Sequence, residues 1–195
     1  ILIYNSGGGL GDSIQLFDII KSLCEKYGEN NIFYLSAHKN HFSNALVDYN
    51  IRINDFKTGV SYFGFRFWHL FISKRKLLLK NSIEKFDLII DLQSKLRNTL
   101  ILKQISNKYF YSSTLNFGFC SDNKNYISTK YDNTKIILNL EKLLNDTIFL
   151  KKYNTDLIDD KYFSEAKRLL PDDNYIGFSI TQGNIYRKKS WPIEK

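Results

Sequence analysis

Short apolar runs alternate with amphipathic segments along the chain, which is the pattern of strands that alternate with helices. Residues 1–4 form the first apolar run, and Gly7–Gly9 interrupt it. From Asp12 or Ser13 onward, apolar residues recur at helical spacing until Gly28. This order predicts a strand, a glycine loop and a helix.

The same alternation continues to residue 150 and predicts a parallel sheet, because parallel strands need long crossover connections that are usually helical. The expected strands are 31–36, 86–92 and 108–112, and the expected helices are 38–47, 96–105 and 134–150. The segment 86–92 is the clearest strand, and polar residues follow its apolar run. We therefore predict an α/β fold, with its site at the carboxyl ends of the strands.

A second unit of the same kind begins late in the chain. Residues 160–170 predict a helix that stops at Pro171, residues 174–180 predict a strand, and 181–184 form a polar loop. The chain starts at Ile1, contains no Met, and stops where the next helix is expected to begin. We therefore expect a fragment that holds one α/β domain and the start of a second.

Composition favours a globular protein with a real core, because 43% of the residues are hydrophobic and 15% are aromatic. The net charge of +8 favours an anionic partner: nucleic acid, a membrane surface or a phosphorylated substrate. Two unmatched cysteines favour a reducing compartment; Cys24 is expected in the core and Cys120 in a polar loop. No apolar run is long enough for a membrane span.

Gly9, Gly11 and Asp12 form the sharpest local feature. Glycines let the backbone adopt positive φ and approach a ligand closely. A dinucleotide fingerprint does not fit, because Asp12 stands where a third small residue is expected and repels phosphate. Asp12 is then a helix N-cap, a base that takes a proton from an incoming hydroxyl, or both.

A second candidate site follows the strand expected at 174–180, where Lys188 and Lys189 precede Trp191 and Pro192. Lysines beside the loop between a strand and a helix neutralise a diphosphate and stabilise it as a leaving group. The alternative is a solvated basic turn with a tryptophan packed on its helix.

Three of these motifs together resemble the heptosyltransferase family, a group of bacterial inverting glycosyltransferases that build the lipopolysaccharide inner core. They are the loop Gly9-Leu10-Gly11-Asp12, the strand 87–93 and the Lys189-Ser190-Trp191-Pro192 segment, in the family's order. The resemblance implies a GT-B architecture of two Rossmann-like domains. Residues 1–155 would be the acceptor-binding domain, and 156–195 a linker helix and the truncated start of the donor-binding domain.

The resemblance also implies the reaction and the partners. A heptose is transferred from ADP-heptose to a lipid-linked inner-core acceptor, without a metal or a further cofactor and without nucleic acid. The protein would be cytoplasmic and peripheral at the inner membrane, and the fragment itself inactive. By position, Asp12 matches the general base and Lys189 the lysine on the donor phosphates. Thr181 and Gln182 stand near the donor-binding hydroxyl residues, where the family more often has paired threonines or Ser-Arg.

On the acceptor side, we expect Gly9, Gly11, Asp91, Gln93 and Arg66 to contribute. Asp91 and Gln93 either line the acceptor cleft or cap the next helix. Arg66 belongs to the stretch 62–80, in which aromatic and basic residues interleave. This stretch either contacts the lipid head group and bilayer, or is an amphipathic helix with its aromatics in the core. The histidines lack partners at metal-ligand spacing.

Two other functions remain open at this point. The first is a GT-B transferase that uses another nucleotide sugar, for a capsule or O-chain. The second is a non-catalytic basic α/β module for nucleic acid, against which stands the spread of the basic residues over several segments.

Overall fold

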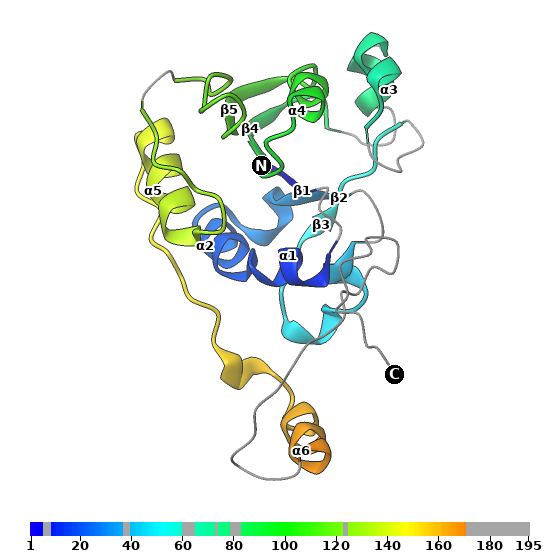
Figure 1. The fold of residues 1–195 in the computed structure, drawn as a ribbon, viewed down its shortest axis with the longest axis vertical. Helices are drawn as coiled ribbons and strands as arrows, with labels where there is room; N and C mark the ends of the chain where they lie inside the picture. Colours follow the sequence, from blue (N-terminus) through cyan, green and yellow to red (C-terminus); the bar gives the residue numbers. More distant parts are fainter. Residues whose placement is uncertain are drawn as a thin grey trace, which may run out of the picture. The chain divides into compact units, whose positions relative to one another are not determined.

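The computed structural model describes residues 1–5, 9–36, 40–59, 65–72, 74–78, 83–122 and 125–170 (Figure 1). The chain divides into two compact units, Ile1–Leu157 and Ile158–Lys195. The described part of the second unit contains one helix, α6 (Asp160–Leu169), capped by the Asp159 side chain, which accepts a hydrogen bond from the Lys161 N–H. No helix in the described ranges combines the length and apolar character needed to cross a bilayer.

The first unit is built on a sheet of five parallel strands in the order β3-β2-β1-β4-β5. The strands are β1 (Leu2–Asn5), β2 (Phe33–Ser36), β3 (Asn54–Asp55), β4 (Phe86–Asp91) and β5 (Asn107–Ser112). The predicted α/β fold with a parallel sheet is confirmed, and the arrangement is Rossmann-like. The short strand β3 was not predicted, because Asn and Asp are poor strand formers.

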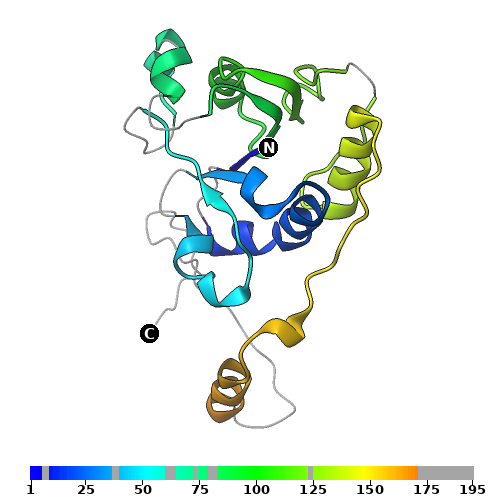
Figure 2. The same ribbon diagram turned by 180° about the vertical axis from the view of Figure 1, so that it is seen from behind.

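Helices cover both faces of the sheet. They are α1 (Leu10–Ile14), α2 (Phe17–Tyr27), α3 (Lys74–Leu78), α4 (Leu96–Leu102) and α5 (Asn133–Leu144). Short 3₁₀ turns connect them: η1 (Glu29–Asn31), η2 (His41–Ser43), η3 (Val47–Tyr49), η4 (Phe67–Phe71) and η5 (Thr155–Leu157). Figures 1 and 2 show α2 beside α5, and the two helices are in contact.

Successive residues of the central strands face opposite cores. Ile3 and Ile90 pack in the core under α2 and α5, whereas Tyr4 and Ile89 pack in the core that includes Ile101 of α4. Burial on both faces explains why these strands read as continuous apolar runs rather than as alternating ones.

The helix expected from Asp12 to Gly28 starts earlier and is interrupted. It begins at Leu10, and a turn at Gln15 and Leu16 separates α1 from α2. The turn buries Leu16 and leaves Ile14 exposed, although helical spacing from Asp12 onward predicts Ile14 on the same apolar face as Phe17 and Ile20. The predicted stop at Gly28 is confirmed, and its φ of 85° favours glycine.

Two other helices were predicted wrongly or too long. In place of the helix at 38–47, the described residues form η2 and η3, because the Asn40 side chain accepts from the Phe42 N–H and Asn44 donates to the Asn40 carbonyl. The helix predicted over 134–150 ends at Leu144, where Asn145 adopts a left-handed conformation with φ 51°.

A strained turn follows β5. Leu115, Asn116 and Phe117 have φ values of 51°, 51° and 65°, so three consecutive residues with side chains are left-handed. Phe117 holds the turn in the core, where its ring lies 5.3 Å from that of Tyr126. The Leu115 side chain is 67% exposed and gains little packing in return for its strain.

We expect Leu115→Gly to raise the unfolding free energy by about 1 kcal/mol, because glycine adopts the left-handed conformation without a steric penalty. The matched change Leu138→Gly, in the interior of α5, is expected to lower it by about 1 kcal/mol or more. Urea unfolding of both variants measures the two shifts. Equal destabilisation by both changes would show that the turn at 115–117 is unstrained.

Candidate functional site

The candidate site lies at the carboxyl ends of β1 and β4. The chain leaves β1 toward β2 and β3 on one side and later adds β4 and β5 on the other, so the strand order reverses between β1 and β4. Open α/β sheets bind their ligands at such a reversal. The strands end there in polar residues, with Asn5 opposite Ser36 and Asp91 opposite Ser112.

Asn5 joins the two halves of this edge. The Gln93 side-chain amide donates to the Asn5 carboxamide oxygen at 2.7 Å, across 88 positions of sequence. The Asn5 amide nitrogen lies 3.5 Å from the Asp12 carbonyl oxygen, to which it donates. Asn5 is buried and Gln93 is half-buried. The predicted residues Asp12 and Gln93 are therefore linked through Asn5, which was not predicted as a site residue.

Asp91 is a buried carboxylate at the centre of a network of hydroxyl groups. Its side chain is 1% exposed. One carboxylate oxygen accepts from the Gln93 N–H at 3.0 Å, and the other accepts from the Thr99 and Ser112 hydroxyls at 2.5 and 2.9 Å. The Thr114 hydroxyl contacts both of those hydroxyls.

These contacts assign Asp91 a positioning role. It holds the turn that carries Gln93, and it ties α4 and β5 to the end of β4. It does not cap α4, whose N-cap is Lys95. Asp91 is enclosed, whereas Gln93 retains partial exposure.

Burial raises the pKa of the Asp91 carboxyl group above its ordinary value, and the hydrogen bonds from Thr99, the Gln93 backbone and Ser112 oppose this rise only in part. Within the described residues, Asp91 forms no ion pair. The hydrogen bonds to its carboxyl oxygens come from neutral groups.

Asp12 lies in the first turn of α1, at the third helical position. The N-cap is Gly9, so the interpretation of Asp12 as N-cap was wrong. Gly9 has an ordinary extended φ of −85°, and its lack of a side chain provides space: a Cβ there would lie 3.1 Å from an Asp12 carboxylate oxygen. A Cβ on Gly11 would meet no atom within 4 Å.

Tyr34 and Ser13 add hydroxyl groups beside Asp12. The two hydroxyl oxygens are 3.5 Å apart, and both side chains are buried. Burial raises the pKa of Tyr34, and the nearby Asp12 charge raises it further, although hydrogen bonds with Ser13 and Asn5 act in the opposite direction. The Tyr34 hydroxyl therefore stays protonated at neutral pH and is available as a donor.

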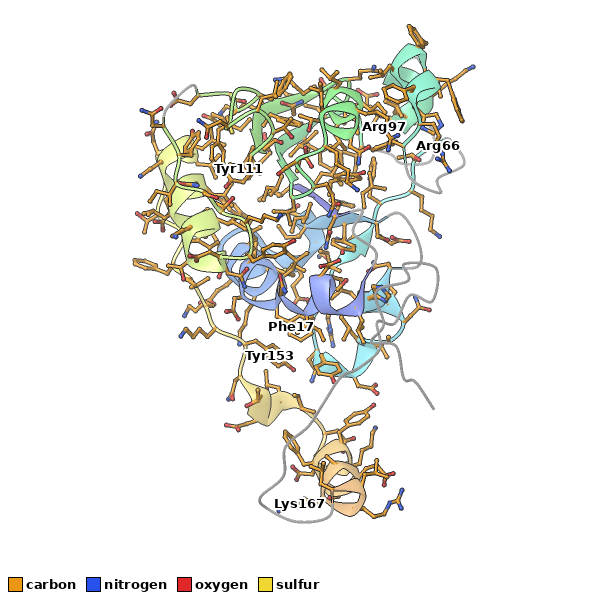
Figure 3. All side chains as sticks on the ribbon, in the orientation of Figure 1. Phe17, Arg66, Arg97, Tyr111, Tyr153 and Lys167 are labelled. Carbon is orange, nitrogen blue, oxygen red and sulfur yellow. The ribbon has the colours of Figure 1, made fainter. Side chains whose placement is uncertain are left out.

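The remaining predicted residues lie elsewhere. Arg66 is exposed at the start of η4, where its N–H donates to His69 Nδ1 at 3.2 Å, and it lies near Arg97 of α4 (Figure 3). The predicted donor-binding residues Thr181, Gln182 and Lys189 lie outside the described residues, as does the strand predicted at 174–180.

Sequence reasoning missed several residues of the site: Asn5, Ser13, Tyr34, Thr99, Ser112 and Thr114. A signal was present for two of them, because Asn5 and Ser112 each end an apolar strand with a polar side chain, as Asp91 does. Ser13, Tyr34, Thr99 and Thr114 occupy ordinary helix, strand and turn positions, and only the fold brings them to this edge.

A separate hollow of about 250 Å³ lies between α2 and the segment that contains Tyr153 and Leu157. Its lining includes Cys24, whose pKa burial raises to about 11. That thiol is protonated at neutral pH, so it is a poor nucleophile and metal ligand. We therefore consider the hollow a weaker candidate for a reactive site than the carboxyl edge of the sheet.

Comparisons of the chain with models of protein families, with curated proteins and with solved structures find no match. The resemblance to heptosyltransferases therefore stays a prediction, and the geometry at the carboxyl edge of the sheet is the basis for a function.

Asp91→Asn is expected to raise the unfolding free energy at pH 7, because the amide is neutral at a buried position that penalises the charged carboxylate. The pKa of Asp91 is higher in the folded than in the unfolded chain. Its stabilising contribution is therefore complete below the unfolded-state pKa, where Asp91 is neutral in both states. It is lost as the pH rises through the folded-state pKa. The advantage of the variant should therefore shrink as the pH falls toward 4. Urea unfolding between pH 4 and 8 measures this difference.

Asp87→Asn is the matched control, because it removes the same charge from an exposed position of the same strand. Its effect is expected to stay within about 0.5 kcal/mol over the same pH range. If Asp91→Asn is instead destabilising at pH 7, the ionised carboxylate is the form that the hydroxyl network favours.

Proposed function

We propose that this chain is the acceptor-binding domain of an inverting GT-B glycosyltransferase of the heptosyltransferase type. The observation that carries the proposal is the place of Asp12. Its half-buried carboxylate stands at the start of α1, beside the reversal of strand order and next to two glycines without side chains to obstruct a ligand. This is the position that a base acting on a bound hydroxyl requires.

In the proposed reaction, Asp12 accepts the proton of an acceptor hydroxyl. The hydroxyl oxygen attacks the anomeric carbon of the donor sugar and forms the new glycosidic bond. The bond between that carbon and the diphosphate oxygen breaks, and its electron pair leaves with the nucleoside diphosphate. Attack on the face opposite the leaving group inverts the configuration, so no covalent enzyme intermediate is needed.

The groups around Asp12 suit a saccharide. The half-buried Gln93 supplies an amide group, which donates to and accepts from sugar hydroxyls without adding charge. Asn5 and Tyr34 are buried and support Gln93 and Ser13 through hydrogen bonds. Asp91 keeps the Gln93 turn in place from beneath. The fixed hydrogen bonds among these groups limit the reorganisation needed when an acceptor binds.

The donor half of the proposal rests on sequence alone. Lys189, with Thr181 and Gln182, is proposed to neutralise the diphosphate as it leaves, without a metal ion. ADP-heptose is the proposed donor and a lipid-linked inner-core saccharide the proposed acceptor, and we place the reaction at the cytoplasmic face of the inner membrane.

The test uses the product of the whole reading frame that encodes this chain, assayed for transfer from ADP-heptose to a heptose-deficient lipid acceptor. Asp12→Asn is expected to lower turnover by about 10²- to 10⁴-fold, because the proton of the attacking hydroxyl loses its acceptor. Binding of the nucleotide sugar, measured by calorimetry, is expected to stay unchanged.

Asp87→Asn serves as the control and should retain full turnover. Undiminished transfer by Asp12→Asn would contradict the assignment of the base. Transfer only from UDP- or GDP-linked sugars would retain the transferase and replace the donor, whereas no transfer from any nucleotide sugar would contradict the proposed function.

Gly11→Ala tests acceptor approach separately from the base. A Cβ fits at Gly11 without contact, so the unfolding free energy is expected to stay the same or rise by about 0.5–1 kcal/mol. The added methyl group would narrow the space over α1, so the KM for the acceptor is expected to rise several-fold while the KM for the donor stays constant. An unchanged acceptor KM would place the acceptor away from this glycine.

A further inference from the structure

The turn η4 exposes three large aromatic side chains. Phe67, Trp68 and Phe71 are 67%, 64% and 90% exposed, within a turn of five residues. The expectation that the aromatics of this stretch form an amphipathic helix with a buried face was wrong for these three. In a 3₁₀ turn, side chains three positions apart are aligned, so Trp68 and Phe71 share one side.

Buried residues of the same segment anchor this turn to the rest of the domain. Phe65 is buried and stacks on Tyr4 of β1 with their ring centroids 5.5 Å apart. His69 is buried and accepts a hydrogen bond from the Arg66 N–H at 3.2 Å. The Leu70 carbonyl accepts from the Gln104 side chain at 2.7 Å.

Two arginines lie close to this turn. The Arg97 guanidinium lies 5.4 Å from the centroid of the Phe67 ring. Burial lowers the pKa of His69, and the charges of Arg66 and Arg97 lower it further. The chain between Asp55 and Glu84 contains no acidic residue. Its basic residues are Lys57, Arg66, Lys74, Arg75, Lys76 and Lys80.

We propose that Phe67, Trp68 and Phe71 insert into the interface of an anionic phospholipid bilayer, with Arg66 and Arg97 at the level of the lipid phosphates. Aromatic side chains partition into the zone between head groups and acyl chains, and basic residues beside them are attracted to anionic lipids. The proposal is independent of the glycosyltransferase activity, because it needs neither the donor nor the acceptor.

A bilayer fits this surface better than a nucleic acid does. Proteins that bind single strands present a basic groove with aromatic platforms along it, so that successive bases stack in a row. Here the rings project from one short turn, and the most exposed of them, Phe71, is 90% exposed to solvent. Aromatic side chains that project in this way fit a lipid bilayer, because the lipids rearrange around them.

The first experiment measures sedimentation of the 195-residue chain with vesicles of phosphatidylcholine alone and with vesicles containing 30% phosphatidylglycerol, a composition of about one anionic lipid in three. The chain is expected to bind the anionic vesicles and to bind the neutral ones much more weakly. The pair Trp68→Ser/Phe71→Ser is expected to weaken binding by at least about tenfold. Arg66→Gln is expected to weaken it by about fivefold, with a smaller dependence on salt.

The matched control is the pair Tyr131→Ser/Phe149→Ser, which removes two aromatic side chains of similar exposure, 72% and 76%, from other segments of the same unit. It is expected to bind as the unchanged chain does. Unfolding curves of both pairs check that neither loses its fold.

A second experiment locates the rings in the bilayer. In a Trp191→Phe background, Trp68 is the remaining tryptophan, so its emission reports this turn alone. Anionic vesicles are expected to shift the emission to shorter wavelength, and lipids brominated on the acyl chain are expected to quench it. Equal vesicle binding by the two serine pairs, or unchanged Trp68 emission, would overturn the proposal. So would a loss of single-stranded oligonucleotide binding, without loss of vesicle binding, in Trp68→Ser/Phe71→Ser.

Discussion

The parallel pairing of β1 with β4 is the interaction on which the rest of the structure depends. It joins the half of the sheet that contains β2 and β3 to the half that contains β5, and it places Tyr4 opposite Asp91. The connection after β1 leads to β2 on one side of it, and the connection after β4 leads to β5 on the other side. The two connections therefore diverge at the carboxyl ends of β1 and β4. Asn5, at the end of β1, and Gln93, just after β4, form a hydrogen bond at this point, and α1 starts nearby. The candidate site is a consequence of this pairing.

The sequence predicts the sheet well because its central strands are buried on both faces. The segment 86–92 and the run at 1–4 are almost entirely apolar, and such runs between helical segments have few other interpretations. Prediction fails where local hydrogen bonds decide the backbone. Asn40 and Asn44 satisfy backbone groups in η2 that a helix would otherwise use, and Asn145 ends α5 in a left-handed conformation. Apolar periodicity contains no information about either.

For the candidate site, the sequence predicts those residues that are close together in the chain or that end a clear strand. Gly9, Gly11 and Asp12 are adjacent in sequence and follow a strand, so their grouping needed no knowledge of the fold. Asp91 and Gln93 were recognised because they end the clearest strand. Their partners Thr99, Ser112 and Thr114 come from a helix, a strand and a turn, and only the order β1-β4-β5 brings them together. These partners also bury Asp91. Because they are distant in sequence, its burial could not be foreseen, and a ligand contact was predicted for it.

Unfavourable local features gather at this same edge of the sheet. Asp91 is a buried carboxylate without a cationic partner in the described part of the chain, and the left-handed turn at Leu115–Phe117 directly follows the strand that supplies Ser112. A buried carboxyl group and left-handed residues with side chains each carry a local free-energy cost. Natural chains retain such features mainly where function depends on them, at the expense of stability. The hollow beside α2 contains one left-handed residue, Asn50 with φ 54°, and its cysteine is a protonated thiol that is partly buried against the core. The buried carboxyl group and the three consecutive left-handed residues distinguish the ends of β4 and β5 from the hollow, and they favour this edge as the functional one.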